Sequence, residues 1–107
     1  MTTKVKVKKS DAVKFLEKLT GGPLTFANMI ESTRLSEELT MAQFSKKLGI
    51  SVSHLNDIEK GRKAVSPERA AKFARTLGYS EKQYVRLALQ DLVSQSGLKF
   101  TVDLEAA

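Results

Sequence analysis

The chain has 107 residues, enough for one small domain with a modest hydrophobic core. Its 18 Lys and Arg outnumber its 12 Asp and Glu, and the net charge of +6 favours an anionic partner. The absence of cysteine excludes disulfides and thiolate-bound metals, and because there is one histidine, a transition-metal site would have to consist mostly of carboxylates.

Residues 1–22 form a basic N-terminal arm that we expect to contain a short helix. Six lysines against two acidic residues give residues 1–20 a net charge of +4. Lysines alternate with Val5 and Val7, which is a short strand signal, and Ser10 then caps a predicted helix over residues 11–19. These lysines either reach towards a nucleic acid or protect an exposed strand edge from aggregation.

Residues 23–93 form one predicted helical domain, in which the helices begin at side-chain caps. The spacing predicts helices at about 25–36, 41–48, 52–60, 67–77 and 81–93. Thr40 with Gln43, and Ser80 with Gln83, match the capping box, in which the two side chains satisfy each other's backbone amides. Ser66 precedes Pro67, which suits the first position of a helix.

Apolar positions in the first and last of these helices predict which faces are buried. In the first helix the inward residues are Phe26, Met29, Ile30 and Leu35. In the last helix they are Tyr84, Val85, Ala88, Leu89 and Leu92.

Residues 94–107 form a C-terminal extension that we expect to contain a strand. Leu98, Phe100, Val102 and Leu104 alternate with polar residues, which is the period of a β-strand. This segment pairs either with the valines of the N-terminal arm or with another protein. We favour the protein interface, because an isolated two-stranded ribbon is marginal in water. The fold class is therefore all-α, a compact bundle of five to six helices with a short C-terminal β-strand extension.

The stretch from residue 40 to residue 63 is the most informative part of the chain. Gly49 supplies a left-handed turn between two short helices, and Ser45 is small where the second helix must approach. Phe44, Leu48, Ile50, Leu55 and Ile58 are the apolar contacts between them. The remaining face of the second helix is polar, as in a helix-turn-helix that places this face in the major groove of DNA.

Residues 40–61, TMAQFSKKLGISVSHLNDIEKG, resemble the helix-turn-helix of the phage-repressor-like (XRE) DNA-binding proteins. The resemblance runs from about Phe26 to Leu77 and implies a lambda-repressor-like fold. In that family an Arg of the first helix commonly pairs with a Glu, which implies a structural salt bridge between Arg34 and Glu59. Where the family often has a phosphate-binding Gln, this chain has Met41.

The tail LKFTVDLE, residues 98–105, together with the capped helices, resembles the small antitoxins of the HigA type. In those proteins one chain binds both its operator and a ribonuclease toxin. The resemblance therefore implies two kinds of partner for this chain, DNA and a toxin.

Each candidate DNA-binding residue has a functional and an ordinary interpretation. Polar and small side chains of the second helix either read base edges or form a solvated helix face, and His54 either contacts DNA or covers that face. Cations after the helix either bind phosphates or belong to a solvated loop. The DNA-binding candidates are Thr40, Gln43, Ser51, Val52, Ser53, His54, Asn56, Lys60, Arg62 and Lys63. Asp57 repels phosphate, so it either points away from the DNA backbone or accepts from a cytosine amine.

Other classes of function have little support in the sequence. There is no cysteine, no second histidine and no glycine-rich phosphate loop, so we expect no enzyme activity, no catalytic residue, no metal site and no cofactor. The apolar runs are far shorter than the about 20 residues that a membrane span needs, and no secretion-signal pattern is present. We therefore expect a cytoplasmic, nucleoid-associated protein that has no membrane partner.

The sequence predicts a sequence-specific DNA-binding transcriptional regulator. We expect it to be an autoregulating repressor and the antitoxin of a toxin–antitoxin pair. Its partners would be a double-stranded operator, a second copy of the chain in a homodimer, and a toxin protein. The alternatives are a stand-alone phage-type repressor, or a protein-interaction module with only incidental DNA affinity.

Overall fold

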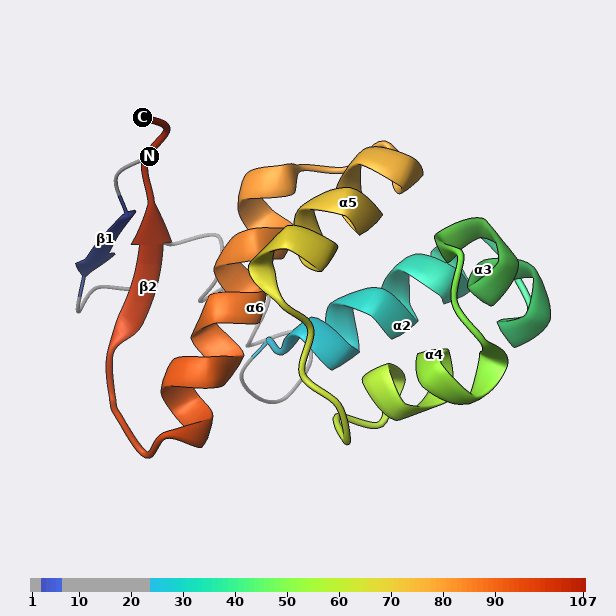
Figure 1. Ribbon diagram of the computed structural model, residues 1–107, viewed down its shortest axis with the longest axis horizontal. Helices are drawn as coiled ribbons and strands as arrows, with labels where there is room; N and C mark the ends of the chain where they lie inside the picture. The colour runs from blue at the N-terminus through green and yellow to red at the C-terminus, as the bar shows by residue number, and fades with distance from the viewer. Residues whose placement is uncertain (1–2, 7–23) are drawn as a thin grey trace.

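The computed structural model describes residues 3–6 and 24–107, and of residues 3–6 it describes the backbone. Within them lie five helices and a two-stranded antiparallel ribbon (Figure 1). The helices are α2 (Phe26–Ser36), α3 (Met41–Leu48), α4 (Val52–Glu59), α5 (Pro67–Leu77) and α6 (Glu81–Gln95), and the strands are β1 (Thr3–Lys6) and β2 (Thr101–Leu104). This confirms the all-α bundle with a C-terminal strand. The predicted helix over 11–19 and the rest of the arm lie outside the described residues.

Each described helix begins at a side chain that caps its first turn. Thr25, Thr40, Ser51, Ser66 and Ser80 each accept a hydrogen bond from the backbone amide three residues later. Such a cap satisfies one of the amides that have no partner inside the helix. Because the cap and the amide are neighbours in sequence, these helix starts agree closely with the predicted ones.

The second predicted capping box forms only in part. Ser80 Oγ accepts from the Gln83 amide at 3.2 Å, as expected. The Gln83 side chain, however, accepts at its Oε1 from Arg86 Nε at 3.2 Å. Arg86 is buried, and a buried guanidinium needs acceptors. The Gln83 side chain is therefore directed towards Arg86, one turn further along α6, and not back to the Ser80 amide.

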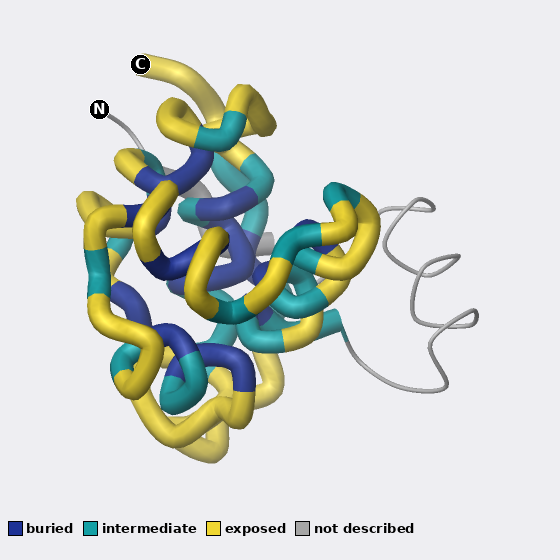
Figure 2. Tube along the Cα trace, turned by 90° about the vertical axis from the view of Figure 1, so that its right-hand side faces the viewer, coloured by how far each residue is buried: buried dark blue, intermediate teal, exposed yellow. Residues whose placement is uncertain are grey.

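One apolar core connects all five helices. Figure 2 shows its buried segments gathered in the middle of the fold. Its members are Phe26, Ile30, Phe44, Leu48, Leu55, Ile58, Val65, Ala70, Phe73, Ala74, Tyr84, Leu87 and Ala88. The prediction was wrong for Leu35 and Leu92, which are 56% and 42% exposed, and it omitted Leu87. Helix α6 packs against α5, α2 and β2, so more than one of its faces is covered.

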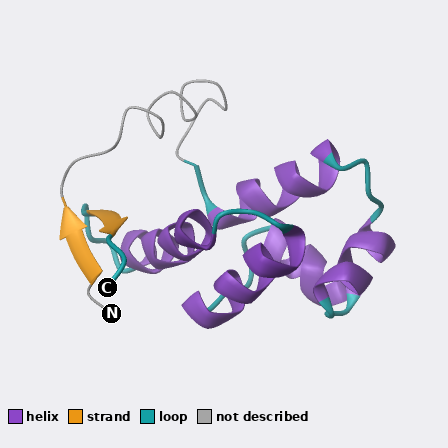
Figure 3. Cartoon of the chain, turned by 90° about the horizontal axis from the view of Figure 1, so that it is seen from above, coloured by secondary structure: helices purple, strands orange, loops and turns teal. Residues whose placement is uncertain are grey.

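The two strands pair within the chain, with Val5 opposite Val102. Val102 is buried, and the other edge of β2 is held by Gln90 of α6. Gln90 Oε1 accepts from the Val102 amide and its Nε2 donates to the Phe100 carbonyl, both at 2.8 Å. Of the two expected alternatives, the structure has the pairing with the valines of the N-terminal arm, and α6 supports a ribbon that would be marginal alone. Figure 3 shows the ribbon at the end of the molecule opposite α3 and α4.

Candidate nucleic-acid interface

Helices α3 and α4 meet across a tight turn that begins at Gly49. Gly49 has φ 74° and ψ 31°, the left-handed conformation in which glycine has no steric cost. The Ile50 amide donates to the Ser45 carbonyl at 3.0 Å, which closes the turn. Ser45 is buried, and its hydroxyl donates to the Ala42 carbonyl at 3.0 Å, so a small side chain occupies the crossing as predicted.

Helix α4 has one buried face and one open face. Leu55 and Ile58 are buried in the core. On the open face, Ser51, Val52 and Ser53 are exposed, and His54 and Asn56 are partly exposed. Val52 is 45% exposed even though it is apolar, which leaves its methyl groups free for contact with another molecule. The five residues Ser51, Val52, Ser53, His54 and Asn56 are called the reading face below.

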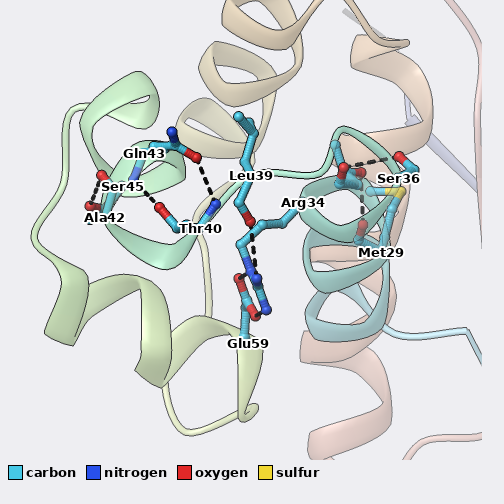
Figure 4. Close-up of polar contacts among 10 residues, drawn as sticks. Met29, Arg34, Ser36, Leu39, Thr40, Ala42, Gln43, Ser45 and Glu59 are labelled. Carbon is cyan, nitrogen blue, oxygen red and sulfur yellow. Dashed lines mark hydrogen bonds and ion pairs between the residues drawn. The ribbon is translucent and has the colours of Figure 1, made fainter.

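Arg34 holds the end of α4 against α2 (Figure 4). Its Nε donates to Glu59 Oε2 at 2.9 Å, its Nη2 to Glu59 Oε1 at 3.1 Å, and its Nη1 to the Leu39 carbonyl at 3.2 Å. The Glu59 side chain is 4% exposed. The hydrogen bond with Glu59 raises the pKa of Arg34 above its ordinary value. The ion pair implied by the resemblance is thus present and joins two helices.

The start of α3 carries the two polar candidates that precede the turn. Thr40 Oγ1 accepts from the Gln43 amide at 3.1 Å, and Gln43 Oε1 accepts from the Thr40 amide at 2.9 Å, so the first predicted capping box is complete (Figure 4). Both side chains are exposed, and the Gln43 Nε2 hydrogens are not used by the box. Met41 packs against the core, so this position stabilises the fold instead of presenting a polar group.

Asp57 organises the basic loop that follows α4. Its carbonyl accepts from the amides of Arg62 and Lys63 at 2.8 and 3.2 Å. Its Oδ1 lies 2.9 Å from Arg62 Nε and its Oδ2 lies 3.8 Å from Lys63 Nζ. Lys60 is exposed at the end of the helix. The structure therefore brings Arg62 and Lys63 together in the loop that follows α4, and the Asp57 carboxylate points towards both cations.

Sequence reasoning missed Arg69 as a neighbour of the reading face. Arg69 lies in the first turn of α5, and its Nη1 is 3.3 Å from His54 Nε2 of α4. The two residues are fifteen positions apart in sequence, and no local pattern relates them, so only the tertiary structure reveals the contact. Arg69 also borders an open hollow of about 320 Å³ between the turn after α3 and helix α5.

Other kinds of site find little support in the part of the chain that the structure describes. Over residues 3–6 and 24–107 no group of three or more metal-ligating side chains comes together. Over the same residues no helix combines the length and apolar character that crossing a membrane requires.

Comparison with known proteins places the chain in a family. The model of the HTH_3 helix-turn-helix family matches residues 30–83, which include α3, the turn and α4. The chain belongs to this helix-turn-helix family. None of the curated protein sequences matches it significantly.

Solved structures with a similar fold include three regulators. One is an HTH_3 family transcriptional regulator from Vibrio cholerae, with a TM-score of 0.51 and 24% identity over 66% of this chain. Another is the hypothetical transcription factor NHTF from Neisseria, with a TM-score of 0.51, 17% identity, and coverage of 66% of this chain and 79% of that one. A third is the clp gene regulator ClgR from Corynebacterium glutamicum, with a TM-score of 0.50, 25% identity, and coverage of 67% and 77%. The match spans 39% of the Vibrio regulator.

Proposed function

We propose that this chain is a sequence-specific DNA-binding transcription regulator that reads the major groove with α4. The observation that carries the proposal is the reading face, a solvent-facing row of small and polar side chains on a helix anchored by Arg34 and Glu59. Membership of a helix-turn-helix family and the likeness to named transcription regulators support it. They also make the chain a binding protein rather than an enzyme.

The residues of the site divide into two proposed roles. Ser51, Ser53, His54 and Asn56 present hydrogen-bonding groups to base edges, and Val52 offers methyl groups to a thymine. Phosphate contacts come from the two ends of the motif, where charge and amide donors are exposed. At the start of α3 these are Thr40 and Gln43, and after α4 they are Lys60, Arg62 and Lys63.

The first experiment enriches, from a random library, the duplexes that the purified protein binds. The affinity for an enriched duplex is then compared with the affinity for an unrelated duplex across a salt series. Asn56→Ala should weaken binding to the enriched duplex by about 5- to 150-fold while changing binding to the unrelated duplex little, because a base contact discriminates by ~1–3 kcal/mol. Gln95→Ala, at the end of α6 remote from α4, is the matched control.

Arg62→Ala should behave differently from Asn56→Ala. A phosphate contact carries no sequence information, so we expect equal weakening on both duplexes and a smaller salt dependence. If the wild-type protein binds all duplexes alike and loses them together as salt rises, the helix-turn-helix acts only as a scaffold and the proposal is wrong.

The finer form of this proposal is a homodimeric, autoregulating repressor that is also an antitoxin. One reading face per chain suits one half-site, and two half-sites on one side of a duplex are ~34–36 Å apart. Strand β2 lies outside the residues that match the family, with Leu98 and Phe100 about half exposed beside it, so this end of the chain is open to a protein partner. The protein would then be cytoplasmic and associated with the nucleoid.

Two measurements test the finer form. In footprinting on the DNA upstream of the gene for this chain, the protein should protect two half-sites. A stand-alone phage-type repressor would give the same footprint but would have no protein partner. Co-expression with the neighbouring gene product should yield a stable complex if the chain is an antitoxin. A failure of co-purification would remove the antitoxin role and leave DNA binding intact.

A further inference from the structure

A side-chain contact extends the reading face from α4 onto α5. Arg69 Nη1 and His54 Nε2 are 3.3 Å apart, and neither residue is fully buried. The Arg69 backbone amide donates to Ser66 Oγ, the cap of α5, at 3.2 Å, so Arg69 lies in the first turn of that helix. The contact therefore joins a candidate base-reading side chain to α5, a helix that contributed no residue to the predicted site.

The chemistry of the contact fixes the proton on the His54 ring. A guanidinium only donates hydrogen bonds, so His54 Nε2 must be the acceptor. A neutral imidazole that accepts at Nε2 carries its proton on Nδ1. Arg69 therefore makes His54 a hydrogen-bond donor for any further partner. In the major groove such a donor suits guanine O6 or N7, adenine N7 and thymine O4, and it does not suit the cytosine amino group.

The contact also leaves the charge of Arg69 uncompensated. Arg62 and Lys63 share the carboxylate of Asp57, whereas Arg69 contacts the His54 ring. Within residues 24–107, no ion pair involves Arg69. Its exposed guanidinium borders the open hollow together with Lys72 and Glu68 of the same helix, so two cations against one carboxylate give this side of the site a net positive charge towards a phosphate.

We propose that Arg69 is a positioning residue of the DNA-reading surface, which orients the His54 ring as a donor to an acceptor base edge and contacts the adjacent phosphate. This inference rests on the proposed DNA-binding function. It predicts that Arg69 influences specificity as well as affinity, and that its effect on specificity acts through His54.

The first test is made on the free protein. Nitrogen-15 chemical shifts of the His54 ring at pH 8 should report a proton on Nδ1 in the wild type. In Arg69→Ala the ring should shift towards the Nε2-protonated form, which water favours. Arg75→Ala is the matched control, because Arg75 lies on the same helix and pairs with Glu81 instead. An Nε2-protonated ring in the wild type would overturn the inference.

The second test is a double-mutant cycle on DNA. Arg69→Ala, His54→Ala and the double variant are compared on an enriched and an unrelated duplex. Arg69→Ala should reduce binding to the enriched duplex about tenfold more than binding to the unrelated one. The double variant should discriminate between the duplexes no worse than His54→Ala, because the two residues act through one contact. The thermal midpoint should stay close to that of Arg75→Ala.

The outcomes separate this inference from the proposed function. If the wild-type protein enriches a sequence but the two substitutions are additive, or if Arg69→Ala weakens both duplexes equally, Arg69 is an ordinary phosphate contact and only the inference is wrong. If the wild-type protein enriches no sequence, the DNA-reading function fails, and the inference that depends on it fails as well.

Discussion

Glu59 buries its carboxylate at the end of α4, and Arg34 is the cation that compensates it. Removing the guanidinium leaves an almost fully buried charge with no partner, which costs ~3–5 kcal/mol in the fully buried case. Because the Arg34 side chain is 17% exposed, we expect Arg34→Ala to lower the free energy of unfolding by ~2–4 kcal/mol in a urea titration.

The exposed pair of Arg75 with Glu81 is the control for this prediction. Its side chains are 59% and 50% exposed, so Arg75→Ala should cost less than ~1 kcal/mol. Equal losses for Arg34→Ala and Arg75→Ala would contradict the structural role given to Arg34.

The negative charge of the Asp91 carboxylate opposes folding, because the carboxylate is partly buried. Its Oδ2 accepts from the Phe26 amide at 3.3 Å, and burial raises the pKa of Asp91 despite that hydrogen bond. A raised pKa in the folded state means that stability is lost as pH rises from the ordinary pKa through the raised one. Asp91→Asn keeps an oxygen acceptor and removes the charge, so it should raise the thermal midpoint at pH 7.

The pH dependence provides the check on Asp91. Below the ordinary carboxyl range both states of the wild type are protonated, so the advantage of Asp91→Asn should disappear there. Glu68→Gln, at an exposed position of α5, should give no such pH-dependent gain. A gain that grows as pH falls would show that the assigned sign is wrong.

At the scale of elements, the turn between α3 and α4 depends on a backbone conformation. A Cβ added at Gly49 would meet no atom within 4 Å, so the cost of Gly49→Ala is that of the left-handed conformation alone. We expect a loss of ~1–2 kcal/mol in the free energy of unfolding. Gly49→Asn should lose less, since asparagine tolerates this conformation better; an equal or larger loss for asparagine would point to a steric cause.

Element boundaries were the best predicted part of the structure. Caps and glycines act on neighbouring residues, so the sequence sufficed to place α3 and α5, and α6 extends two residues beyond its predicted end. Burial was predicted less well. Leu35 is exposed because α2 ends in a turn facing solvent, and Leu87 is buried because α6 is covered on several sides.

At the scale of the whole molecule, the two-stranded ribbon lies at the end opposite α3 and α4 (Figure 1). Gln90 connects β2 to α6 by two hydrogen bonds, each worth ~0.5–1.5 kcal/mol. We expect Gln90→Ala to speed hydrogen exchange at the Val102 amide and to leave binding to the enriched duplex unchanged.

Gln95→Ala, on the same helix near its end, is the control for the Gln90 prediction. Unchanged protection of the Val102 amide in Gln90→Ala would mean that β1 alone holds the strand. A loss of DNA binding would mean that the two ends of the molecule are coupled.

The sequence by itself determined the features that depend on near neighbours. Side-chain caps, the glycine turn and the polar face of α4 follow from residues within a few positions of one another, and together they identified the helix-turn-helix and its candidate residues. The tertiary structure decided the contacts between distant segments. These are the pairing of β1 with β2, the attachment of β2 to Gln90, and the contact of Arg69 with His54. Local periodicity carries no information about which helices meet, because that depends on how the whole chain buries its apolar surface.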